Sequence, residues 1–277
     1  MKLEPFNVEK PVIGVIHLPP LPGSPRFSGD LSEIVERAVR EARILEDCGV
    51  NGVIVENFWD VPFKVRVRDA ETIASMTVIV KNIVDEVNIP VGVSLLRNSG
   101  VEALAIAYAC NAKFIRVNAL CQVIVAPEGI LYPIARELIE LKYKLKSNVR
   151  IYADVNVKHG KPLVERDIVD VAKECIERGM AEAIILTGSR TGKVVELNDI
   201  LKLRKAKLGK PIVVGSGINL NNIAKYWSIA DGFIVGTYFR VNGDLSKPID
   251  RERVNKLMRE VERLRVDSGK SPTQLLI

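Results

Sequence analysis

The chain is poor in the residues that build disulfide frameworks and metal centres, with four cysteines and two histidines among 277 residues. No two cysteines stand in a CxxC pair. This argues against a disulfide framework and a zinc site, and it indicates a reducing compartment.

Long apolar runs are also missing. No segment offers about 18 uninterrupted apolar residues, so we expect no transmembrane helix. The opening residues, MKLEP, include an early acid and lack an apolar stretch, so we expect no signal peptide. Together with the reducing compartment, these absences predict a cytoplasmic protein.

Aromatic residues make up 5% of the chain, although the net charge is +6. The basic runs at 142–146 and 201–210 lie on expected amphipathic helices and are not interleaved with aromatics, which argues against nucleic-acid binding. A mild positive field would instead attract small anionic ligands or an anionic lipid surface. We therefore expect a phosphorylated small-molecule ligand, with peripheral membrane association as an alternative.

The chain is rich in short β-branched runs, and segments with apolar residues at helical spacing separate them. Such nearly continuous runs are typical of strands covered on both faces. Eight strand–helix units predict an α/β fold, a single-domain (β/α)8 TIM barrel over 1–277. An open doubly wound sheet is the alternative, weakened because no GxGxxG follows the first run. The expected strands are 12–18, 52–57, 91–96, 113–120, 150–157, 183–187, 211–215 and 232–236.

Helix signals support this division. Asp30 can cap the first helix, with Glu33 three residues on, and Gly49 is placed to stop it. The fifth helix is expected from Glu165 onward, with Gly179 as its stop. A last helix over 251–265 precedes an apolar chain end, LLI, which predicts docking on a partner copy and hence a homo-oligomer.

Residues at strand ends converge on one mouth of a barrel. Arg116 and Lys158 could orient a carbonyl, an enolate or a second phosphate there, and Asn156 is a further substrate-binding candidate. The alternative is a buried ion pair of Arg116 with Asp154 or Glu56. The acid–base candidates at this face are His17, Glu56, Asp154 and His159.

The same four residues could bind a divalent metal, but no HxH or HExxH spacing supports a metal site. We therefore predict no cofactor and assign no metal ligand. A histidine at a strand end can also serve only to satisfy a backbone group.

The strongest local signal for a ligand follows the last two strands. Gly215, Ser216 and Gly217 end the seventh run, and Gly236 and Thr237 end the eighth. Glycines let backbone N–H groups approach an anion, and barrels often hold phosphate between these two loops. A simple tight turn is the alternative reading of these glycines.

The loop after the sixth strand is small, hydroxyl-rich and basic. Thr187, Gly188 and Lys193 are candidates for contacting the phosphorylated ligand, and Gly188 and Gly192 could act as hinges of a lid. An ordinary exposed loop is equally consistent with this composition. The pattern is not a phosphate loop of the Walker A type, because GxxxxGK[ST] is not satisfied.

Several of these stretches together resemble the BtpA family. They are 13–25 (IGVIHLPPLPGSP), 52–63 (GVIVENFWDVPF), 154–159 (DVNVKH), the loop 187–192, and 215–217 (GSG). The resemblance implies a ribulose-phosphate-binding-type barrel. It also implies a family whose cyanobacterial namesake is associated with photosystem I biogenesis. Other members occur in organisms without photosynthesis, and some of these lie beside sugar-metabolism genes. It supplies no catalytic residues, so the candidate site rests on barrel geometry.

Two functions follow from these observations. The first is an enzyme, an isomerase, lyase or hydrolase, acting on a sugar phosphate or nucleotide derivative. The second is a non-catalytic factor in the biogenesis of a membrane complex, for which the apolar segment 58–63 would be the interaction surface. The alternative for that segment is a lid packed over the second and third loops.

Overall fold

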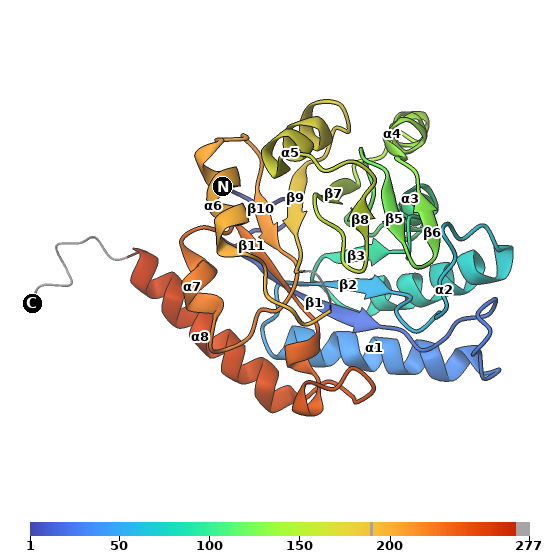
Figure 1. The fold of residues 1–277 in the computed structure, drawn as a ribbon. Helices are drawn as coiled ribbons and strands as arrows, with labels where there is room; N and C mark the ends of the chain where they lie inside the picture. Colours follow the sequence, from blue (N-terminus) through green and yellow to red (C-terminus); the bar gives the residue numbers. More distant parts are fainter. Residues whose placement is uncertain (189–190, 270–277) are drawn as a thin grey trace, which may run out of the picture.

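Eight parallel strands close into one barrel in the computed structural model, which describes residues 1–188 and 191–269 (Figure 1). The first strand pairs with the second and also with the last, since Ile13 is in register with both Gly52 and Ile234. The predicted (β/α)8 barrel is confirmed, and the open sheet is excluded. In barrel order the strands are β1 (Val12–His17), β2 (Gly52–Glu56), β3 (Val91–Ser94), β4 (Phe114–Val117), β7 (Arg150–Asp154), β9 (Ala183–Leu186), β10 (Ile212–Val214) and β11 (Gly232–Val235).

The barrel strands bury both of their faces. On β1, Ile13 and Val15 point into the barrel, while Val12 and Ile16 pack against the surrounding helices. Figure 1 shows the helices around the outside of the strands. These are α1 (Leu31–Asp47), α2 (Ala70–Glu86), α3 (Gly100–Cys110), α4 (Ala135–Lys144), α5 (Ile168–Glu177), α6 (Leu197–Lys205), α7 (Ile223–Trp227) and α8 (Arg251–Gly269), with 3₁₀ turns η1 (Thr237–Phe239) and η2 (Val241–Gly243).

The predicted helix signals are correct for α1 and partly wrong for α5. The Asp30 side chain accepts a hydrogen bond from the backbone N–H of Glu33 at 3.1 Å, and Gly49 adopts a φ of +83°. The fifth helix begins at Ile168 and not at Glu165, because the Asp167 side chain caps it.

The end of α5 and the last helix also differ from expectation. Met180, with a φ of 54°, takes the left-handed conformation expected of Gly179. Gly179 is needed for space, since a Cβ there would lie 2.4 Å from the Cys121 sulfur. The last helix runs on to Gly269, and the apolar end 275–277 lies outside the described residues. Within the described part of the chain, no helix combines the length and apolar character needed to cross a bilayer.

A small antiparallel sheet lies outside the barrel, in segments where the sequence predicts no strand. It consists of β5 (Ile124–Ala126), β6 (Gly129–Leu131) and β8 (Lys161–Pro162). Ile124 and Leu131 are buried on its inner face with Ala119 and Val157. Strands of two or three residues are too short to show a periodicity in the sequence, which is why the pattern did not reveal them.

A buried ion pair joins the first helix to the segment that follows the last strand. Arg240 is fully buried, and its two terminal nitrogens donate to the Glu41 carboxylate at 2.5 and 2.8 Å. Its partner lies in the middle of α1, 199 residues earlier in the chain. These two charge-assisted hydrogen bonds offset the desolvation free energy of burying both charges.

We expect Glu41→Ala to lower the free energy of unfolding by about 3–5 kcal/mol, because it leaves the Arg240 charge buried and unpaired. Urea denaturation followed by circular dichroism measures this. Glu36→Ala, an exposed position on the same helix, is the control and should leave stability unchanged. A Glu41→Ala protein as stable as that control would show that the pair does not stabilise the fold.

Candidate functional site at the barrel mouth

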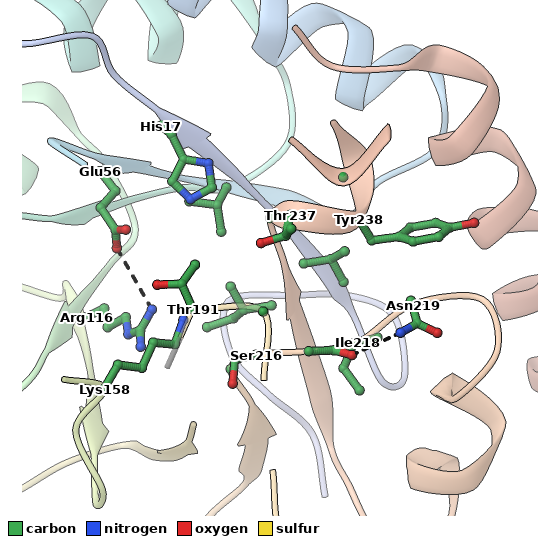
Figure 2. Close-up of a pocket in the computed structure, with 18 of the residues that line it drawn as sticks. His17, Glu56, Arg116, Lys158, Thr191, Ser216, Ile218, Asn219, Thr237 and Tyr238 are labelled. Carbon is green, nitrogen blue, oxygen red and sulfur yellow. Dashed lines mark hydrogen bonds and ion pairs between the residues drawn. The ribbon is translucent and has the colours of Figure 1, made fainter. Parts of the chain in front are cut away.

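Two connected cavities occupy the mouth at the carboxyl ends of the strands. A small one of about 200 Å³ lies by β10, β11 and β1, and a larger one of about 830 Å³ lies under the segment 58–63. The residues that line both are His17, Glu56, Arg116, Lys158 and Thr191. Figure 2 shows four of them, Glu56, Arg116, Lys158 and Thr191, on one side of the small cavity.

The glycines after the last two strands line the small cavity, together with Ser216 and Thr237. Gly217 has a φ of +72°, and a Cβ there would lie 2.6 Å from the Val194 Cα. A Cβ on Gly236 would lie 2.7 Å from the ring of His17. A side chain at either position would therefore displace backbone or the buried imidazole.

The glycine turn, residues 215–218, offers backbone N–H groups as hydrogen-bond donors. Within residues 1–188 and 191–269, no acceptor is bonded to the backbone N–H of Ser216, Gly217 or Ile218. Thr237 and Tyr238, the first two residues of η1, line the same cavity, and the first N–H groups of a 3₁₀ turn have no acceptor within the turn. Backbone donors gathered around one cavity can form an anion-binding site.

Arg253 supplies a positive charge that the sequence analysis missed. It lies in the first turn of α8, lines the small cavity, and donates from Nε to the Tyr238 carbonyl at 2.7 Å. Its guanidinium lies 4.4 Å from the centre of the Tyr238 ring. A cation in the first turn of a helix is unfavourable for the helix dipole, and that local conflict is the signal that could have drawn attention to it.

The Ser216 hydroxyl is already bonded within the protein. It accepts from the Gly188 N–H at 2.6 Å and donates to the Lys193 carbonyl at 2.9 Å. These bonds join the loop after the sixth barrel strand to the turn after the seventh. Positions 189–190 of that loop lie outside the described residues.

Four predicted ligand-binding residues lie outside both mouth cavities. Asn156 and Thr187 hold each other through bonds of 2.7, 2.8 and 2.9 Å that join the fifth and sixth barrel strands at their ends. With Gly188 and Lys193 they line a neighbouring groove of about 1000 Å³. Their predicted contact with ligand stays a prediction, and the structure does not bring them to the glycine turn.

His159 is the exposed member of the predicted acid–base set. It lines the larger cavity and the neighbouring groove, and its Nε2 lies 3.2 Å from the Thr191 hydroxyl. Asp154 also lines the larger cavity but not the small one. The structure therefore brings His17 and Glu56 to the glycine turn and leaves the other two candidates further away.

Arg116 lies between two carboxylates at the centre of the mouth. Its Nε and one terminal nitrogen donate to both oxygens of Asp154 at 3.0 and 2.9 Å, and Asn118 donates to Asp154 at 2.8 Å. The other terminal nitrogen lies 3.9 Å from the Glu56 carboxylate. A dashed line in Figure 2 marks this ion pair. Arg116 and Asp154 therefore form the buried ion pair that the sequence left as an alternative. Both oxygens of the Asp154 carboxylate already accept hydrogen bonds.

Glu56 keeps one oxygen available. Its Oε2 accepts from the Ser94 hydroxyl at 3.0 Å, and within the described residues no hydrogen bond uses Oε1. Because Glu56 lines both cavities, this oxygen is the carboxylate best placed for proton transfer at the mouth.

His17 is buried in positive surroundings. Burial first, and then the charges of Arg240 and Lys158, hold the pKa of its imidazole well below the usual value. Its Nδ1 has no hydrogen-bond partner among the described residues, and the Phe58 ring packs edge-on at 4.7 Å. A neutral imidazole can donate a hydrogen bond from one ring nitrogen and accept one at the other without adding charge.

Lys158, like His17, has a lowered pKa. Burial, followed by the nearby Arg116 charge, lowers the pKa of its ammonium to about 8, and Glu56 and Asp154 only partly oppose this. No hydrogen bond or ion pair joins Nζ to any other described residue. The amine therefore enters the cavity unpaired.

The acid–base candidates do not form a metal-binding cluster in the described part of the chain. Across residues 1–188 and 191–269, no three His, Cys, Asp or Glu side chains come together as a set that could hold a metal ion. The divalent-metal alternative thus has no ligand set in this part of the protein.

Comparison with known proteins gives matches along nearly the whole chain. A family model described as the BtpA family matches residues 8–263. An uncharacterized protein of Methanocaldococcus jannaschii is 43% identical, over 95% of this chain and 99% of its own. The photosystem I biogenesis protein BtpA of Synechocystis is 42% identical, over 90% of this chain and 87% of its own.

Solved structures with the same fold are much more distant in sequence. One is (S)-3-O-geranylgeranylglyceryl phosphate synthase from Thermoplasma acidophilum, solved with its substrate sn-glycerol-1-phosphate. It is 17% identical, has a TM-score of 0.56, and the match covers 92% of this chain and 94% of that one. At this identity the likeness shows the barrel fold alone.

We expect Gly217→Ala to destabilise the protein more than Gly209→Ala. Both glycines have a φ near +70°, but a Cβ at Gly209 meets nothing within 4 Å. Each change costs about 1 kcal/mol for the left-handed backbone, and Gly217→Ala adds about 1–3 kcal/mol for the collision with the Lys193–Val194 backbone. Equal losses in urea denaturation would show that the close approach does not matter.

We expect the imidazole of His17 to stay neutral well below the pH at which an ordinary histidine takes up a proton, because protonation would place a charge in a buried, positive site. Its NMR chemical shift should then stay constant as the pH falls through about 6.5, with His159→Asn used for assignment. Since the unfolded chain does protonate, this group lowers stability as the pH falls below about 6.5. A titration midpoint near 6.5 would contradict the assignment.

Proposed function

This chain belongs to the BtpA family, and we propose that it is an enzyme acting on a phosphorylated small molecule at the carboxyl face of its barrel. The observation that carries the proposal is the small cavity. It combines the guanidinium of Arg253 with backbone N–H groups at Ser216, Gly217 and Ile218 that no acceptor in the described part of the chain uses. Backbone donors with one fixed cation suit a phosphate monoester.

The connected cavities support a substrate with two parts. The phosphate end fits the small cavity of about 200 Å³, and the larger one of about 830 Å³ receives the rest of the molecule. Aromatic and apolar residues of the segment 58–63 line the larger cavity, so this segment covers the mouth as a lid would. A sugar phosphate or a nucleotide derivative has this shape.

The groups at the junction of the cavities suit acid–base chemistry. Glu56 offers a free carboxylate oxygen, His17 is held neutral, and Lys158 is an unpaired amine. Isomerisation, bond cleavage in a lyase and hydrolysis all use such groups. The fold neighbour solved with sn-glycerol-1-phosphate supports a phosphorylated ligand for barrels of this shape.

A second candidate is a non-catalytic role in the biogenesis of a membrane complex, since the Synechocystis relative is named as a photosystem I biogenesis protein. An exposed apolar face favours it: Val125 and Ile130 oppose each other on the small sheet, and Leu163 and Val164 follow β8. Such a face suits a protein partner or a lipid surface. Liposome flotation and pull-downs should lose any association in a Val125→Lys, Ile130→Lys variant, and an absence of association in the parent protein would exclude this role.

A cytoplasmic location and a homo-oligomeric state stay predictions from the sequence. Analytical ultracentrifugation of the purified protein would measure its oligomeric state.

We expect inorganic phosphate and sugar phosphates to raise the melting temperature. A ligand at 100 times its Kd adds about 2.7 kcal/mol, which corresponds to several degrees for a chain of this size. Arg253→Met should abolish the shift, whereas Arg259→Met, an exposed position on the same helix, should keep it. If no phosphorylated compound stabilises the parent protein, the proposed function is wrong.

A further inference from the structure

We propose that the substrate carries a carbonyl group as well as a phosphate, and that the amine of Lys158 captures the carbonyl carbon as a Schiff base. This inference rests on the proposed phosphate site and names the substrate class and the covalent step at that site.

The position of Lys158 is the first reason. It follows β7, lines both mouth cavities, and extends beside Arg116 toward Thr191 (Figure 2). Its backbone carbonyl accepts a hydrogen bond from Arg97 at 2.7 Å, which fixes the base of the side chain. A molecule with its phosphate at the glycine turn therefore presents its remaining atoms to this amine.

The second reason is that the amine has no bonding partner among the described residues, although carboxylates lie near it. Elsewhere lysines bind the carboxylates beside them, as Lys64 does with Asp69 and Lys142 with Glu182, at 2.7 and 2.8 Å. At the mouth, Arg116 takes both oxygens of Asp154, and the Oε2 of Glu56 contacts Ser94 and Arg116. The other oxygen of Glu56 stays free, and no ion pair among the described residues joins it to Lys158. A lysine used only for charge balance would form an ion pair.

The acidity of the group agrees with this geometry. Burial and the neighbouring Arg116 charge lower the pKa of Lys158 to about 8, against an ordinary 10.5. At neutral pH this gives about 300 times more free amine than an ordinary lysine. A desolvated lysine beside another cation is a recognised form of activated amine nucleophile.

The step balances without any added reagent. The amine lone pair forms a C–N bond to the carbonyl carbon as the carbonyl π electrons move to oxygen. A proton passes from nitrogen to that oxygen, a second proton lets it leave as water, and a protonated imine remains. Glu56, with its free Oε1, is the group at hand to carry the protons. The imine withdraws electrons from the adjacent carbon, which favours isomerase or lyase chemistry over hydrolysis.

Borohydride trapping tests the inference. The full chain is incubated with dihydroxyacetone phosphate or glyceraldehyde 3-phosphate in the presence of cyanoborohydride, and the modified residue is located by peptide mass spectrometry. We expect one adduct, on Lys158, at least ten times more abundant than on Lys161, an exposed lysine three residues away. Inorganic phosphate should reduce it, and unphosphorylated dihydroxyacetone should give at least ten times less.

Matched variants and ligands separate this inference from the proposed function. Lys158→Arg keeps the charge and Lys158→Met keeps the length; both should lose the adduct and still be stabilised by sn-glycerol-1-phosphate, which has no carbonyl. Lys161→Arg should leave the adduct unchanged. If the carbonyl phosphates raise the melting temperature but label Lys158 no more than Lys161, the inference is wrong and phosphate binding stands. If no phosphorylated compound binds, both are wrong.

Discussion

The chemistry of the barrel mouth depends on one buried guanidinium. Closing the barrel brings Arg116 on β4 against Asp154 on β7 and within 3.9 Å of Glu56 on β2. A buried arginine must be paired, and Asp154 pairs with it through both carboxylate oxygens. This leaves Glu56 partly free and Lys158 without a partner, so the strongest ion pair at the mouth determines which neighbouring groups can take part in chemistry.

The positive charges around this pair explain the state of the remaining groups. Arg240, Lys158 and Arg116 all disfavour a proton on His17, and Arg116 and Arg97 disfavour one on Lys158. A site with excess positive potential and few free carboxylates suits an anionic ligand. Bound phosphate would in turn offset part of the repulsion that lowers these pKa values.

The site also depends on two glycines that allow the backbone to approach its neighbours closely. Gly217 lies against the Lys193–Val194 backbone, and Gly236 lies against the ring of His17. The Ser216 hydroxyl fastens the same turn to the sixth loop through Gly188 and Lys193. The turn is thus held from several sides, so its conformation does not depend on a bound ligand.

The sequence by itself determined the barrel, the family, the α1 cap at Asp30, and the glycine turns after the last two strands. Each of these is written in a local pattern: β-branched runs, apolar stripes, a capping residue, or glycine where space or φ requires it. Only the tertiary structure decided that Arg253 lines the same cavity as the glycine turn. It also decided that Asn156 and Thr187 bond each other outside the mouth, and that the charge of Asp154 is paired with Arg116. These depend on how loops from distant strands meet once the barrel closes, and no local periodicity records which way a loop side chain turns.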